Sequence, residues 1–209
     1  MATTNPWYCI PLADYEGHME LPEIGQSQYI SQSIDKITKN ELFNTVTIIG
    51  CAGGNGFDKL LANGVNKIIG IDINPEYINT AKIRFPCYNF NVIIDDICDL
   101  KNDISNVDLV IAALVFEYID IETALNNIYS MLSNNGQLFV ILQAPNKNIN
   151  SISTSKYQSL KFLGSLFQYV SPDELISTAH NKRLILQNIS TNKLPSGKEF
   201  HEILFVKKQ

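Results

Sequence analysis

Apolar residues run through most of this chain in short blocks that alternate between strand-like and helix-like spacing. From residue 45 onward, runs rich in β-branched residues are separated by segments whose apolar positions recur every three or four residues. Because strands alternate with helices in this way, we expect a mostly parallel sheet with helices on both faces. The core strands predicted are Thr45–Ile49, Lys67–Ile71, Asn89–Ile94, Asp108–Leu114 and Gln137–Leu142.

The segments between these strands carry the start and stop signals of helices. The first predicted helix buries Phe57, Leu60 and Leu61 and stops at Gly64. Asn74-Pro75 reads as the N-cap and first position of a second helix, which ends near Phe85. The remaining predicted elements are a helix on Ile121, Leu125, Ile128 and Leu132, a turn at 134–136, a helix from the Ser171-Pro-Asp-Glu174 capping box to about His180, and a hairpin of Leu184–Ile189 and Glu199–Val206 that turns at 195–197.

The first residues of the chain follow a different pattern. Aromatic residues are interleaved with proline and glycine there, which favours turns and irregular backbone. A short amphipathic helix on Ile30, Ile34 and Ile37 precedes the core. We therefore predict an N-terminal lid or helical arm over 1–44, with an arm packed on the sheet edge as the alternative, and one compact domain over 45–209. The polar stretch 146–159 predicts a long connection or a second lid.

Composition narrows the possible partners. A chain of 209 residues suffices for one well-buried α/β core, and its net charge of -5 provides no basic surface for nucleic acid. No apolar run approaches the ~20 residues of a membrane span, and no secretory signal is visible. The cysteines at 9, 51, 87 and 98 lack metal-ligand spacing. We expect a cytoplasmic monomer or homodimer that binds no metal, nucleic acid or membrane, and frequent Asn, Ile and Lys favour a bacterial source.

The first predicted strand ends in a glycine-rich loop, and the second ends in an acid. The loop reads Gly50-Cys-Ala-Gly-Gly54-Asn-Gly56, and the acid is Asp72. This order brings bare backbone close to one carboxylate, which suits a nucleoside-bearing cofactor. A dinucleotide fingerprint requires Gly-x-Gly-x-x-Gly, and neither register of the loop provides it. A nicotinamide-dependent oxidoreductase is therefore disfavoured, although it stays an alternative.

The loop resembles the first motif of class I S-adenosylmethionine-dependent methyltransferases, with its shorter Gly-x-Gly-x-Gly core. Segments 95–100, 108–118 and 132–142 are similar to later motifs of that family and occur in the same order. The resemblance implies a Rossmann-like, doubly wound, seven-stranded sheet with S-adenosylmethionine as cofactor and S-adenosylhomocysteine as product. Asp72 would hold the ribose, and Asp96, with Asp95 as the alternative, the adenine amino group. The implied cofactor residues are Gly50, Cys51, Ala52, Gly54, Asp72, Ile73, Asp96, Ile97 and Leu114.

Two positions depart from the family pattern. Ile48 stands where the family usually carries an acid, and Ala52 replaces the middle glycine of the loop. Both departures favour the alternative of a non-catalytic nucleoside-binding module. Patterns near the two ends of the chain resemble a bacterial methyltransferase subgroup whose substrates are unassigned.

Methyl transfer requires an acceptor aligned with the methyl group in a dry pocket, and an oxygen or nitrogen acceptor also benefits from a general base. Glu117, His18 and His201 are the candidates for that base. Without a basic groove or an added docking domain, we expect a small-molecule acceptor. The candidate substrate-binding residues are Tyr15, Tyr118, Tyr157 and Lys198.

Overall fold

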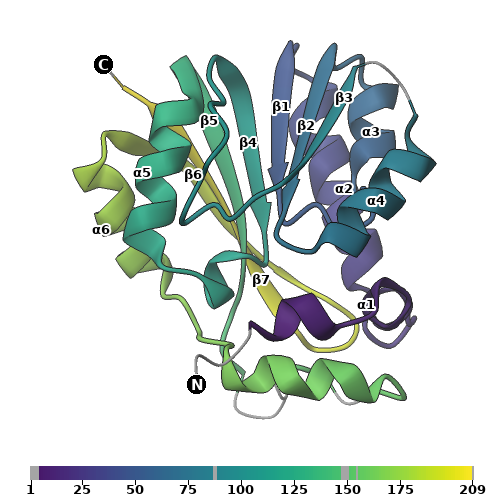
Figure 1. Ribbon diagram of the computed structural model, residues 1–209. Helices are drawn as coiled ribbons and strands as arrows, with labels where there is room; N and C mark the ends of the chain where they lie inside the picture. Colours follow the sequence, from purple (N-terminus) through teal and green to yellow (C-terminus); the bar gives the residue numbers. More distant parts are fainter. Residues whose placement is uncertain (1–4, 87–88, 147–150, 154, 209) are drawn as a thin grey trace.

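The protein is built on one seven-stranded sheet with the strand order β3-β2-β1-β4-β5-β7-β6. The computed structural model describes residues 5–86, 89–146, 151–153 and 155–208. Strands β1 to β5 run parallel to one another, whereas β7 runs antiparallel to both β5 and β6, which confirms the predicted sheet and its C-terminal hairpin (Figure 1). The strands are β1 Thr45–Ile49, β2 Lys67–Asp72, β3 Phe90–Ile94, β4 Val107–Ala113, β5 Leu132–Gln143, β6 Leu184–Lys193 and β7 Glu199–Lys207.

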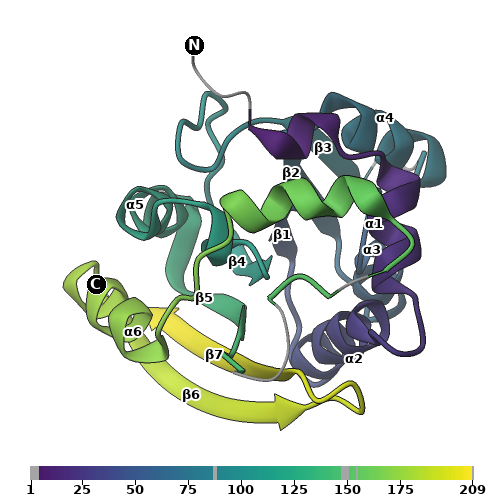
Figure 2. The ribbon, with the colours of Figure 1, turned by 90° about the horizontal axis from the view of Figure 1, so that it is seen from below.

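Helices cover both faces of the sheet. Figure 2 shows α2, α3 and α4 on one side and α5 and α6 on the other. Each face has its own apolar core, so every residue of β1 is buried: Val46 and Ile48 pack on the α2 side and Ile49 on the α5 side. The helices are α1 Leu12–Met19, α2 Gln26–Lys39, α3 Phe57–Ala62, α4 Pro75–Arg84, α5 Ile121–Met131 and α6 Pro172–Asn181, and the short 3-10 helices are η1 Pro6–Cys9, η2 Phe116–Tyr118 and η3 Gln158–Ser165.

The structure confirms some of the predicted helix ends and not others. The Asn74 side chain accepts hydrogen bonds from the backbone N–H groups of Glu76 and Tyr77, at 2.9 and 3.4 Å, so it caps α4. Gly64 follows α3 with a φ of 79°, as a helix-ending glycine should. The Ser171 side chain makes no capping bond, although α6 begins there. Leu61 was predicted to be buried and is 38% exposed.

Two backbone segments differ from the prediction. Residues 12–19, expected to be irregular, form α1, and Tyr157 packs so closely on Gly17 that a Cβ there would lie 2.6 Å from the Tyr157 Cζ. Tertiary contact thus stabilises a short helix with weak intrinsic propensity. Residues 134–136, expected to turn, belong to β5 instead. Asn135 adopts a φ of 61°, and the pairing of β4 with β5 shifts register between Val107 and Leu109.

The N-terminal segment and η3 lie across the carboxyl ends of the parallel strands (Figure 1). They share an apolar cluster built on Ile10, Leu160 and Leu163. The Ser159 hydroxyl donates to Asp14 at 2.6 Å, and Arg84 of α4 forms an ion pair with Glu16 of α1. The N-terminal segment and η3 therefore cover the end of the sheet where ligands bind in open α/β folds. Of the polar stretch 146–159 predicted as a connection, 147–150 and 154 lie outside the described residues.

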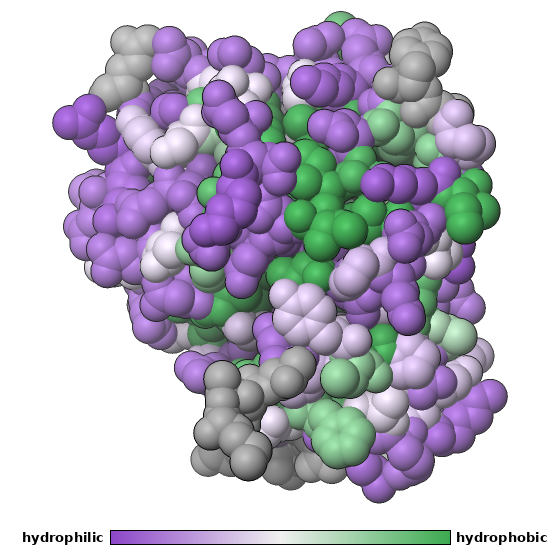
Figure 3. Space-filling model, viewed as in Figure 1, coloured by the Kyte–Doolittle hydropathy of each residue, from purple (hydrophilic) through white to green (hydrophobic). Residues whose placement is uncertain are grey.

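The connection from β3 to β4, residues 95–106, contains no helix. Figure 3 shows apolar residues gathered in one central area, over the part of the sheet that this connection crosses in Figure 1. Elsewhere this face is mostly hydrophilic. No described helix is both long and apolar enough to span a membrane.

Candidate functional site

A cavity of about 310 Å³ lies at the carboxyl ends of β1, β2 and β4 and against the loop after β3. Open α/β sheets bind ligands at this edge, and the volume falls within the ~300–1,000 Å³ of typical small-molecule sites. Most of the residues predicted to bind the cofactor line it, namely Gly50, Ala52, Asp72, Ile73, Asp96, Ile97 and Leu114. Cys51 and Gly54 do not line it, so their predicted contact with the cofactor is not supported.

Backbone hydrogen bonds hold the glycine-rich loop against β2. The N–H groups of Gly50 and Cys51 donate to the Ile71 carbonyl at 2.8 and 3.2 Å. Gly50 has a φ of +68°, and a Cβ there would lie 2.9 Å from Val115, so the loop requires glycine at this position. Ala52 also has a positive φ, of 47°, which costs an L-residue roughly 1 kcal/mol. Its N–H donates to Asp72 at 2.9 Å, which holds Ala52 in this conformation.

Asp72 connects the loop to the start of α4. Its two carboxylate oxygens accept from the N–H groups of Ala52 and Asn74, each at 2.9 Å. Burial raises the pKa of Asp72, although these backbone donors oppose that effect. Each carboxylate oxygen offers two acceptor positions, so both have capacity left for a ligand hydroxyl. Asp72 is therefore placed to accept hydrogen bonds from a ribose.

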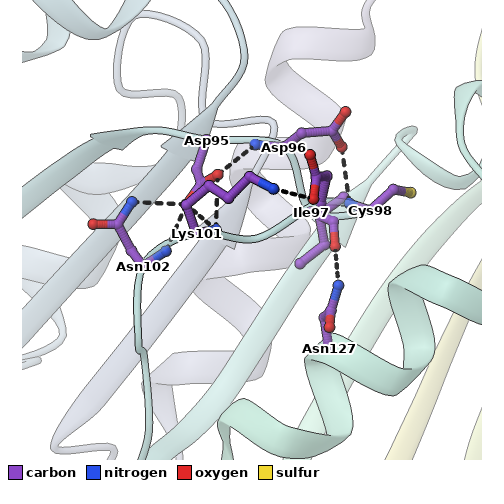
Figure 4. Close-up of polar contacts among 8 residues, drawn as sticks. Asp95, Asp96, Ile97, Cys98, Lys101, Asn102 and Asn127 are labelled. Atoms are coloured by element: carbon purple, nitrogen blue, oxygen red, sulfur yellow. Dashed lines mark hydrogen bonds and ion pairs between the residues drawn. The ribbon is translucent and has the colours of Figure 1, made fainter.

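The two acids after β3 have different roles (Figure 4). Asp95 accepts from the backbone N–H groups of Lys101 and Asn102, and from the Asn102 side chain at 2.7 Å. Burial favours its neutral form, but these bonds outweigh that effect and lower its pKa. Asp96 turns toward Cys98, whose N–H donates to its Oδ1 at 2.8 Å, and its Oδ2 accepts from no described residue. The contacts thus favour Asp96 over Asp95 as the ligand acceptor.

Gly54 supports the loop from behind, and its replacement by alanine should lower the free energy of unfolding by about 2–4 kcal/mol. Its φ is +101°, and a Cβ would lie 2.4 Å from the Phe85 ring, so backbone strain and overpacking both contribute. Gly64→Ala is the matched control, because its φ is +79° and nothing lies within 4 Å of its Cβ. Urea unfolding measures both variants. Equal losses would contradict the assigned role of Phe85.

A second, smaller cavity of about 60 Å³ adjoins the first. Both cavities are lined by Trp7, Tyr15, Leu114 and Tyr118. The Trp7 ring meets Tyr15 and Tyr118 edge-on, with ring centroids 5.6 and 5.2 Å apart. The Asn74 side chain donates to the Trp7 carbonyl at 2.9 Å. Aromatic side chains from the N-terminal segment and η2 therefore form the wall between the two cavities.

Buried polar groups face the small cavity. Lys198, from the turn before β7, donates to the Ser151 carbonyl at 3.0 Å and to the Gln143 side chain at 3.2 Å. Loss of hydration lowers the pKa of Lys198 to about 8, so the amine stays mostly protonated at neutral pH. His18 lies 2.9 Å from the Ser155 hydroxyl through Nδ1. Burial, together with the charge of Lys198, lowers the pKa of His18.

Comparison with known proteins matches part of the chain to a protein family. A family model described as "Methyltransferase domain" matches residues 48–140, which contain the glycine-rich loop, Asp72 and Asp96. Residues 48–140 therefore resemble a methyltransferase domain, and the match covers somewhat less than half of the chain. The seven-stranded sheet has the strand order of the Rossmann-like fold of class I S-adenosylmethionine-dependent methyltransferases, so S-adenosylmethionine is the cofactor expected in the large cavity.

The known proteins that this chain resembles are distant from it in sequence. An uncharacterized methyltransferase-like protein of Schizosaccharomyces pombe is 27% identical over 133 residues, which are 62% of this chain and 48% of that protein. The chain thus spans about half the length of this curated relative. A chain from a complex between the Trm112 methyltransferase activator and a methyltransferase of Haloferax volcanii matches with a TM-score of 0.75 at 15% identity, over 100% of both chains. The N-methyltransferase NodS of Bradyrhizobium japonicum, in complex with S-adenosylhomocysteine, matches with a TM-score of 0.68 at 17% identity, over 100% of this chain and 94% of that one.

The residues that line the large cavity fit S-adenosylmethionine. Bare backbone at Gly50 permits close approach, Asp72 and Asp96 offer carboxylate oxygens for hydroxyl and amino groups, and Ile97 and Leu114 provide apolar surface for a purine ring. Ile48, at the position of the usual family acid, is buried on the α2 side of β1 and does not line the cavity. No three acidic, histidine or cysteine side chains of the described residues are grouped so as to hold a metal ion.

The structure separates the candidates for catalysis and substrate binding. His18 and Lys198 line the small cavity, and Tyr15 and Tyr118 line both cavities. Glu117, His201 and Tyr157 line neither. Their predicted contacts with substrate are therefore not supported, and each has a different structural reason.

Glu117 lies under the site. It is 1% exposed, and its Oε1 accepts from the Gln143 N–H at 2.7 Å, so it holds the end of β5 next to the small cavity. His201 pairs with Thr191 of the neighbouring strand at 2.9 Å. Tyr157 packs on Gly17 of α1.

Trp7 and Gln143 are among the site residues that sequence reasoning missed. Trp7 stood out as an aromatic residue of the N-terminal segment, but only the fold places it between the cavities. Gln143 is the last residue of β5 and bonds Lys198. The rule that ligands bind at the carboxyl ends of parallel strands would have identified Gln143, had that strand been extended by one residue.

Proposed function

We propose that the protein transfers a methyl group from S-adenosylmethionine to a small-molecule acceptor bound in the small cavity. The supporting observation is the wall of Trp7, Tyr15, Leu114 and Tyr118, which both cavities share. An acceptor in the small cavity thus lies next to the site proposed for the cofactor. A volume of about 60 Å³ suits a small molecule or one small group of a larger one. S-adenosylmethionine supplies a methyl group on positively charged sulfur, and the electrons of the carbon–sulfur bond stay on sulfur as the acceptor forms its new bond.

The residues around the cavity contribute orientation, exclusion of water and a base. Residues 5–44, as the described part of the predicted arm, act with η3 as a roof that keeps the reaction dry. His18 is the proposed base for the proton of an oxygen or nitrogen acceptor, because its lowered pKa keeps the ring neutral at physiological pH. Tyr15 and Tyr118 orient the acceptor against the shared wall. Residues 45–209 remain the predicted catalytic domain, and cytoplasmic location, bacterial source and oligomeric state remain predictions.

A radiolabel-transfer experiment tests the proposal. The protein is incubated with methyl-labelled S-adenosylmethionine and three fractions of a cell extract: dialysable small molecules, RNA and protein. We expect label in the dialysable fraction, and no such label with the Asp72→Asn variant, because this variant weakens the cofactor site. Label confined to RNA or protein would contradict a small-molecule acceptor. Binding of S-adenosylhomocysteine without transfer to any fraction would favour a non-catalytic nucleoside-binding module.

A further inference from the structure

The small cavity contains a buried ammonium group with unused donor capacity. Lys198 is 3% exposed and has three N–H donors, of which two meet the Ser151 carbonyl and the Gln143 side chain. Both acceptors are neutral, and no carboxylate of the described residues forms an ion pair with Lys198. The sequence outside the described ranges contains no aspartate or glutamate. The side chains of this protein therefore provide no counter-charge for Lys198.

A buried ammonium group without a counter-charge lowers the stability of the protein when no ligand is bound. A buried charge is normally paired, because hydration lost on burial must be replaced by opposite charge and hydrogen bonds. Lys193 shows the ordinary arrangement, an exposed ammonium group that pairs with Glu199 at 3.4 Å. Lys198 instead faces a cavity that adjoins the cofactor site. Its missing partner is therefore a group that arrives with a ligand.

Charge and size define that group. His18 is the other titratable base lining the cavity, and burial together with Lys198 keeps it neutral at physiological pH. Among the described residues, the cavity thus offers one positive charge together with neutral donors, such as the Gln143 amide, in about 60 Å³. A phosphate dianion would need more positive charge, whereas a carboxylate matches one ammonium.

We propose that the methyl acceptor is a small carboxylic acid and that Lys198 binds its carboxylate. Gln143 orients the ammonium group, and Glu117 holds Gln143 in place from below. With the carboxylate at Lys198, the rest of the acceptor extends toward Leu114 and Tyr118, on the wall shared with the cofactor cavity. This inference rests on the proposed function, since it names the substrate class of the same site.

Acetate and acetamide are the probes, because they have the same shape and differ in charge. Their binding to the protein saturated with S-adenosylhomocysteine is measured by ligand-observed NMR, with chloride keeping the ionic strength constant. We expect acetate to bind and acetamide to bind at least 10-fold more weakly. Lys198→Met should lower acetate affinity roughly 10–100-fold, the usual effect of losing a hydrogen-bonded charge. Lys193→Met, the same substitution at an exposed lysine five residues earlier, should leave acetate affinity unchanged.

Titration with S-adenosylhomocysteine comes first and separates the two proposals. If the parent protein does not bind S-adenosylhomocysteine, the proposed function itself fails. If S-adenosylhomocysteine binds but acetate does not, or acetate binds Lys198→Met as well as the parent, the carboxylate inference is overturned and the proposed function stands. A selective loss of S-adenosylhomocysteine affinity in Lys198→Met would show that Lys198 holds the carboxylate of the cofactor, which also overturns the inference. Retained affinity in this variant shows that it is folded.

Discussion

Replacing Asp72 with asparagine is expected to lower the affinity for S-adenosylhomocysteine about 100-fold, the upper part of the range for lost hydrogen bonds to a charged group. Both carboxylate oxygens already accept a backbone N–H, from Ala52 and Asn74. Asparagine has one acceptor oxygen and an NH₂ group that can only donate, so the variant loses a ribose acceptor and loosens the loop at Ala52. Isothermal titration calorimetry measures the change.

Asp108→Asn is the matched control for this substitution. Asp108 also accepts two backbone N–H groups, from Asn44 and Thr45 at 2.8 and 2.9 Å, but does not line either cavity. It should cost stability without changing affinity for S-adenosylhomocysteine. Unchanged affinity in Asp72→Asn, or an equal loss in both variants, would contradict the role assigned to Asp72.

The second large effect concerns the pH dependence of stability. Burial raises the pKa of Glu117 from 4.5 to about 7, against the opposing hydrogen bond from the Gln143 N–H. Below pH 4.5 the carboxyl group is protonated in both the folded and the unfolded state, and its contribution to stability is fully present. As pH rises above 4.5, the carboxyl group ionises in the unfolded state but stays protonated in the folded state. The folded state therefore loses relative stability until its own carboxyl group ionises near pH 7. The loss amounts to about 3 kcal/mol between pH 4.5 and pH 8.

Glu117→Gln has no such titration. The difference in unfolding free energy between the parent and this variant should therefore shift by about 3 kcal/mol over that pH range, in favour of the variant at high pH. Urea unfolding at several pH values gives both numbers. Glu122→Gln, at an exposed glutamate that pairs with Lys182 at 2.9 Å, reports the effect of removing a carboxylate at the surface. A constant difference between the parent and Glu117→Gln would show that Glu117 is not held neutral by burial.

The cofactor half of the site was readable from the sequence because its parts are close along the chain. Residues 46–73 form one strand–loop–helix–strand unit, whose glycines and terminal acid have a fixed order. The carboxyl ends of adjacent parallel strands meet at one edge of the sheet. Asp72 ends β2 and Asp96 follows β3, so their strand positions alone place them beside the loop after β1. The choice of Asp96 over Asp95 needed the contacts of Asn102 and Lys101, which strand alternation does not reveal.

The acceptor half of the site was beyond sequence reasoning because it joins distant segments. His18 comes from α1, Gln143 from the end of β5 and Lys198 from the final turn. The same holds for α1, which tertiary packing stabilises against weak local propensity, and for residues 134–136, which continue β5 although an Asn-Asn-Gly run favours a turn.

By itself, the sequence determined the parallel core and the C-terminal hairpin, and it indicated the loop and acids that line the large cavity, because period, order and local spacing define them. The tertiary structure alone decided which polar groups became buried. Glu117 follows the predicted strand 108–114 and Lys198 follows the predicted turn 195–197, yet the fold places one beneath the site and the other facing the small cavity. Burial depends on which segments pack over a residue, and here the N-terminal segment and η3 come from distant parts of the chain.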